Sequence, residues 1–97
     1  MSEYARVVTF DADDAALDAL VAEIAGSDGA PEGVSATRIT VLADRAAGKL
    51  VVAVRFPTEE ALREGAAVLE AMSPPAGTDI RRVAVDEYEV VLERSAS

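Results

Sequence analysis

Residues 37–72 read TRITVLADRAAGKLVVAVRFPTEEALREGAAVLEAM, and this stretch decides the fold. Residues 37–43 alternate isoleucine and valine with other side chains, and residues 50–56 are rich in valine, which is typical of strands. The residues between them, 44–48, end in glycine, as short hairpin loops often do. Pro57 ends the second strand because it cannot donate a hydrogen bond to a neighbouring strand. The stretch therefore predicts a β-hairpin.

A helix is predicted to follow over residues 58–72. Thr58 is a good N-cap, and Glu59 and Glu60 place negative charge at the positive end of the helix dipole. An apolar stripe recurs at helical spacing. It consists of Ala61, Leu62, Ala66, Leu69 and Met72. Gly65 lies within the stripe and would permit close packing, and Ser73-Pro74-Pro75 ends the helix.

The N-terminal part repeats a strand and a helix. Residues 4–10 are predicted to form the first strand, and Asp11 is predicted to cap the first helix. A second apolar stripe marks that helix. It consists of Ala16, Leu17, Leu20, Val21 and Ile24. Gly26 is expected to end the helix, and residues 26–36 are turn formers that predict a surface loop without a phosphate-binding motif.

Residues 82–92 predict the last strand, and residues 94–97 are expected to be a disordered tail. The predicted order is β-α-β-β-α-β over a single domain, residues 1–97, an α+β class chain. A short hairpin and two right-handed crossovers give a four-stranded antiparallel sheet with both helices on one face. This is the ferredoxin-like sandwich.

Alternation along each strand divides the side chains between two sheet faces. The predicted helix-covered set is almost wholly apolar: Ala5, Val7, Thr9, Ile39, Val41, Leu50, Val52, Val54, Phe56, Val83 and Val85. The predicted open set is mixed: Tyr4, Arg6, Val8, Phe10, Arg38, Thr40, Leu42, Val51, Ala53, Arg55, Arg82, Ala84, Asp86 and Tyr88. Such a mixed face suits a homodimer in which one sheet packs on another.

Four arginines stand on the predicted open face, one on each strand. In one interpretation they pair with carboxylates across the dimer interface, since buried charges need partners, and the candidates are Glu3, Glu87 and Glu89. In the other they bind an anionic small molecule. The candidate ligand-binding residues are Arg6, Arg38, Arg55, Arg82 and Tyr88. No catalytic residue is assigned.

Composition excludes several classes of function. The chain has 97 residues, a net charge of −9 and no His, Cys, Trp, Asn or Gln. Without His or Cys, imidazole bases, thiolate nucleophiles and cysteine metal sites are excluded, and no cofactor or metal is expected. The acidic balance makes nucleic acid and anionic membranes unsuitable partners. No signal peptide or membrane span is visible, so we expect a cytoplasmic protein.

Three segments resemble the antibiotic biosynthesis monooxygenase family of the dimeric α/β-barrel superfamily. They are DRAAGK at 44–49, TEEAL at 58–62 and VDEYEV at 85–90. The similarity covers the order of elements, and in sequence mainly residues 41–72 and 83–92. It implies a homodimer whose two sheets form a barrel, and an enzyme that oxidises a small aromatic molecule without a cofactor.

Several residue types on which such enzymes and their haem-degrading relatives rely are missing here, which disfavours a haem-degrading role. The strand-end aromatic is Phe56, where similar sequences often have Trp. Two functions therefore stay open: binding or oxidation of a small aromatic or acidic molecule, and a catalytically inert structural or accessory homodimer. An amino-acid-sensing module and an RNA-recognition module share the element order, but the single short chain and its acidic charge disfavour them.

Overall fold

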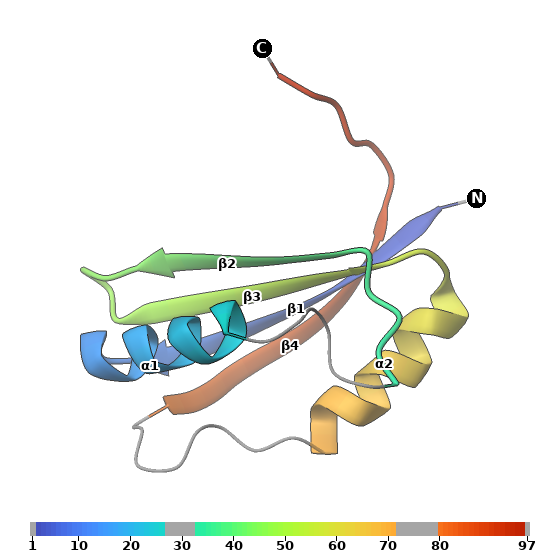
Figure 1. The fold of residues 1–97 in the computed structure, drawn as a ribbon. Helices are drawn as coiled ribbons and strands as arrows, with labels where there is room; N and C mark the ends of the chain where they lie inside the picture. Colours follow the sequence, from blue (N-terminus) through green and yellow to red (C-terminus); the bar gives the residue numbers. More distant parts are fainter. Residues whose placement is uncertain (1, 27–32, 72–79, 97) are drawn as a thin grey trace.

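The computed structural model describes residues 2–26, 33–71 and 80–96. Within them the elements follow the predicted order: β1 (Glu3–Ala12), α1 (Asp14–Ala25), β2 (Arg38–Asp44), β3 (Lys49–Phe56), α2 (Glu59–Ala71) and β4 (Ile80–Val90). The strands form one antiparallel sheet in the order β2-β3-β1-β4, and both helices lie on the same face of it (Figure 1). The α+β class is confirmed, and the arrangement is compatible with a ferredoxin-like fold.

Two predicted features fall outside the described residues. These are most of the loop after α1, at residues 27–32, and the end of the second predicted helix, at residues 72–75. The last strand runs from Ile80 to Val90, whereas residues 82–92 were predicted, so it begins and ends earlier than expected. Residues 91–96 lie outside the sheet. No helix in the described ranges is long and apolar enough to cross a membrane.

The first helix begins later than predicted. Its N-cap is Asp13, whose Oδ1 accepts a hydrogen bond from the Ala16 N–H at 2.8 Å. Asp11 instead remains in β1 and accepts hydrogen bonds from Lys49 and Arg81 at 3.1 and 3.0 Å. The strand continues through the predicted cap because these two cations stabilise the Asp11 carboxylate at the sheet surface.

The hairpin and the second helix start as the sequence predicts. The Asp44 carboxylate accepts a hydrogen bond from the Ala47 N–H in the turn, at 3.1 Å. Gly48 then takes a left-handed conformation, with φ of 67°, which other residues rarely adopt. At the helix, Thr58 Oγ1 accepts from the Ala61 N–H at 3.1 Å and caps α2.

The core lies between the sheet and the helices in two clusters. Phe56 lies at the centre of the cluster under α2, and Leu17 and Leu50 belong to the cluster under α1. All three side chains are fully buried. Val52 of β3 packs against both clusters and joins them. Burial of each large apolar side chain contributes roughly 1.5–3 kcal/mol, so these contacts hold both helices on the sheet.

The prediction of which β1 residues face the helices is wrong. Tyr4 lies directly opposite Phe56, and Arg6 lies opposite Val54, so these β1 residues share the helix-covered face. Ala5 and Val7 consequently point to the open face. The apolar pattern of β1 fits either face, and the sequence interpretation placed Ala5, Val7 and Thr9 inside because that set is almost wholly apolar. In the structure, a carboxylate on α2 pairs with the guanidinium of Arg6 and permits its burial.

A β-bulge changes the alternation of β4. Ala84 lies opposite Thr9, whereas the next register pair joins Arg82 to Phe10, so Val83 is an extra residue. Arg82 therefore turns to the helix-covered face, and its predicted place on the open face is wrong. Asp86 and the other β4 residues beyond the bulge lie as predicted. The strict two-residue period of the prediction did not allow for the extra residue.

We predict that Gly65→Ala destabilises the protein. A methyl group at Gly65 would overlap the ring of the fully buried Phe56 and lie 3.4 Å from Val34 Cγ1. Alanine raises helix propensity by up to ~1 kcal/mol, but overpacking costs about 1–3 kcal/mol. Urea unfolding should therefore give a lower free energy of unfolding than in the wild type. An increase would show that the ring can move aside, contrary to the packing described.

Candidate functional site

The face of the sheet away from the helices is the candidate functional surface, here called the open face. Opposed residues form four rows across the strands in the order β2-β3-β1-β4. Row one is Arg38, Arg55, Ala5 and Tyr88; row two is Thr40, Ala53, Val7 and Asp86; row three is Leu42, Val51, Thr9 and Ala84; row four is Asp44, Lys49, Asp11 and Arg81.

The middle rows of the open face are mainly apolar and small. Leu42 is 56% exposed and Tyr88 of the neighbouring first row is 55% exposed. Large apolar side chains scattered singly at a surface need no explanation, but here they frame a continuous patch of valine, alanine and threonine. A patch of this kind is suited to contact with another protein surface.

Row four alternates in charge across the sheet. Asp11 lies between Lys49 and Arg81 and accepts a hydrogen bond from each. The hydrogen bond from Arg81, and to a lesser extent that from Lys49, holds the pKa of Asp11 below its ordinary value of 3.8. The carboxylate is therefore ionised at neutral pH, and the row presents acid, base, acid and base in order from β2 to β4.

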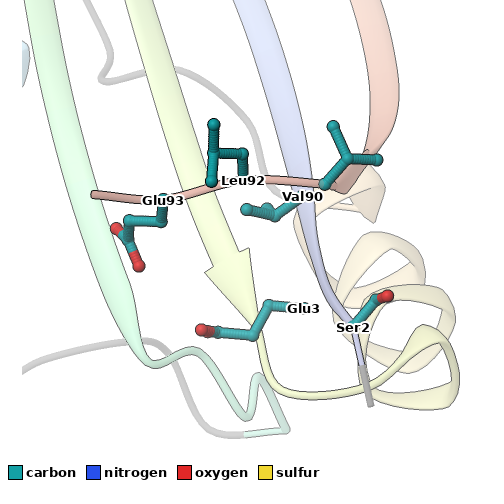
Figure 2. A pocket seen from close by; sticks show the side chains of 6 residues that line it. Ser2, Glu3, Val90, Leu92 and Glu93 are labelled. Atoms are coloured by element: carbon teal, nitrogen blue, oxygen red, sulfur yellow. The ribbon is translucent and has the colours of Figure 1, made fainter.

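Row one contacts the C-terminal segment. Glu93 accepts a hydrogen bond from Arg55 at 2.9 Å and lies 3.9 Å from Arg38. Glu3 adds a contact to Arg55 at 3.9 Å within the same protomer, whereas the sequence interpretation expected such a pair across the dimer interface. Figure 2 shows the segment after Val90 running across the strands from β4 toward β2. The segment thus borders the open face at its first row.

A hollow of about 390 Å³ lies beside this crossing. It is lined by Ser2, Glu3, Val90, Val91, Leu92 and Glu93 (Figure 2). Val91 and Leu92 are 85% and 80% exposed, and the hollow is open to solvent. Ligand pockets are usually concave and enclose most of their ligand. This hollow has neither an arginine nor a tyrosine in its lining, unlike the pocket that a small aromatic acid would need.

On the other face, Arg6 and Arg82 share one carboxylate. Glu70 of α2 accepts from Arg6 at 2.8 Å and from Arg82 at 2.5 Å. The Arg6 side chain is only 5% exposed. Hydrogen bonding by Arg82, with the nearby charge of Arg6, holds the pKa of Glu70 below its ordinary value of 4.5. The triad fastens α2 to β1 and β4.

The structure does not bring the predicted ligand-binding residues together. Arg6 and Arg82 lie on the helix-covered face, whereas Arg38, Arg55 and Tyr88 lie on the open face. One ligand cannot contact both sets. Ligand binding by either set alone stays a prediction. In the described ranges, no group of three or more acidic side chains is arranged to hold a metal ion.

Two carboxylates that organise these arginines were missed in the sequence. Glu70 lies four residues after Ala66 of the apolar stripe, so helical spacing could have placed it at the edge of the sheet-facing side. Glu93 had no such signal, because its contact with Arg55 depends on where the chain turns after Val90. The predicted partners Glu87 and Glu89 were chosen instead.

We predict that Glu70→Gln lowers the thermal unfolding midpoint by several degrees. The substitution removes the carboxylate that compensates the buried guanidinium of Arg6, and an uncompensated buried charge is unfavourable. Circular dichroism melts would measure the change. Glu64→Gln, at an exposed position of the same helix, is the matched control and should leave the midpoint nearly unchanged. Equal effects of the two substitutions would contradict the role of Glu70.

The ion pairs of Glu70 with Arg6 and Arg82 predict that the stability of the protein depends on pH. Because the folded protein lowers the pKa of Glu70, the ionised carboxylate stabilises the fold above the unfolded pKa, and this contribution is lost as pH falls through the folded pKa. Urea midpoints at about pH 7, 5, 4 and 3 should therefore converge for wild type and Glu70→Gln as acid is added. A constant difference across this range would mean that ionisation of Glu70 is irrelevant to stability.

Comparison of the chain with protein-family models, with curated proteins and with solved structures found no match. The resemblance to the antibiotic biosynthesis monooxygenase family therefore stays a prediction.

Proposed function

We propose that this chain functions as a non-catalytic homodimer, a structural or accessory module whose two sheets pack face to face through the open face. One observation carries the proposal: among the described residues, both helices cover the same side of the sheet and leave the other side open, and Leu42 and Tyr88 on its edge strands are more than half exposed. Burial of this face against a second copy would complete a two-sheet core with helices outside.

The size of the face sets the expected strength of the dimer. Four strands about 4.8 Å apart, each contributing about seven residues at ~3.4 Å, span a projected area on the order of 450 Å² per protomer. Two such faces would approach the lower end of specific interfaces, which bury roughly 1,200 Å² or more in total accessible surface. We therefore expect a reversible dimer whose population changes with concentration.

The arginines favour this function over recognition of an acidic molecule. Arg6 and Arg82 already bind Glu70, and Arg55 binds Glu93. An anionic ligand would have to displace these carboxylates, and the guanidiniums on the helix-covered face are additionally needed to hold α2. The dimeric barrel that the family resemblance implies would be the same sheet-to-sheet assembly. Oxidation of an aromatic molecule has no further support beyond that resemblance.

Leu42→Glu is predicted to weaken the dimer without unfolding the chain. Leu42 is exposed in the protomer, so an ionised side chain there is tolerated until a second sheet covers it. Sedimentation velocity over a concentration series would measure the effect. The wild type should approach twice the chain mass of 10.1 kDa, and Leu42→Glu should remain near that mass.

The matched control is Val21→Glu, which introduces the same charge at another exposed apolar residue, on α1. This variant should associate as the wild type does. Loss of association in both variants would point to a general effect of charge. A wild type that stays at the mass of one chain up to millimolar concentration would sink the proposed function.

A further inference from the structure

The charges of the open face define how a second copy can lie on it, and this inference rests on the proposed homodimer. A symmetric dimer that joins two identical faces has a two-fold axis between the sheets. Sheets that pack face to face keep their strands nearly aligned, at about −30°. The axis therefore runs either along the strands or across them, and the two choices bring different residues together.

An axis along the strands keeps each row opposite itself but reverses the strand order, so β2 faces β4 of the partner. In row four, Asp44 then lies opposite the partner's Arg81, and Lys49 lies opposite the partner's Asp11. Opposite charges meet at every position of the row. In row three, Leu42 lies opposite the partner's Ala84, which joins apolar surface to apolar surface.

The same axis also gives the charged residue of row one on β2, Arg38, favourable contacts with the partner. In row one, Arg38 lies opposite the partner's Tyr88, whose ring can accept a guanidinium on its face. The neighbouring row of that strand carries Asp86, about 7 Å away, within reach of a long arginine side chain. Arg38 is 67% exposed, and its contact with Glu93 is long, at 3.9 Å. Within the described part of the chain, Asp86 forms no ion pair.

An axis across the strands is less favourable. Each strand would face its own copy with the rows reversed, so row one would cover row four. Two of the four positions would then be complementary: Arg38 would lie opposite the partner's Asp44, and Tyr88 opposite the partner's Arg81.

The two central positions of this alternative are not complementary. Arg55 would lie opposite the partner's Lys49, which joins like charges, and Ala5 would cover the partner's Asp11 without adding a cation. The axis along the strands joins opposite charges at all four positions of row four, so it is the more favourable of the two.

We infer that the two-fold axis of the homodimer runs along the strands, so that β4 of each protomer faces β2 of the other and Asp86 meets the partner's Arg38. The pair occurs twice in the dimer. Asp86 and Arg38 stand on the two edge strands of one sheet, so neither can reach the other within a protomer. The pair between Asp86 and Arg38 can therefore form only between two protomers.

A mixing experiment with two charge-reversal variants tests the inference. Asp86→Arg places two arginines opposite each other at both contacts, and Arg38→Asp places two aspartates there. Each variant alone should lose at least ~10-fold in dimer affinity, because opposed like charges at an interface are costly. An equal mixture should form a heterodimer within about 3-fold of wild-type affinity, because each contact again joins Arg to Asp. Native mass spectrometry of an isotope-labelled and an unlabelled variant would count the heterodimer.

Glu64→Arg and Arg63→Asp are the matched controls, since they make the same charge changes on the outer side of α2. Both should dimerise as the wild type does, alone and mixed. If wild type dimerises but the open-face variants keep their affinity or their mixture fails to recover it, the axis is wrong while the proposed homodimer stands. If wild type itself stays monomeric, the proposed function fails, and this inference fails with it.

Discussion

The contact between Arg6 and Glu70 permits a charged side chain on the helix-covered face of the sheet. Arg6 stands in the middle of β1 with 5% of its side chain exposed, and a guanidinium in such a place needs a carboxylate. Glu70 supplies it from α2 and binds Arg82 of β4 as well, which ties the helix to two neighbouring strands. Once this face of β1 is turned inward, Ala5 and Val7 must face outward. The apolar open face thus requires that the charge of Arg6 be compensated on the other side of the sheet.

This arrangement separates two uses of arginine. Arg6 and Arg82 position a helix within the protomer, whereas Arg38 stands at an edge strand with most of its side chain exposed. Interfaces favour arginine because its planar group binds carboxylates and aromatic rings in defined geometry. One residue type therefore builds the fold in the protomer and, in the proposed dimer, would present a charge pattern to the second copy.

The sequence predicted the class, the element order, the hairpin and the Thr58 cap, because each follows from local patterns. It did not predict the faces of β1, where Tyr4 and Val8 could satisfy the pattern as well as Ala5 and Val7. The orientation found in the structure places Arg6 inside, and it depends on the distant Glu70 to pair with that charge. Nor did it predict the bulge at Val83, which depends on pairing with β1. Of the candidate surface, Arg38, Arg55, Asp86 and Tyr88 were placed correctly, since their strands keep a regular register there.

The sheet leaves two strands without a neighbour on one side, β2 and β4. They differ in how well they are protected against pairing with a foreign strand. Charged residues are frequent along β4, whereas β2 reads RITVLAD and has charges only at its ends. Short segments with high β-propensity and low net charge add strands readily, which makes β2 the point from which fibrous aggregates would grow.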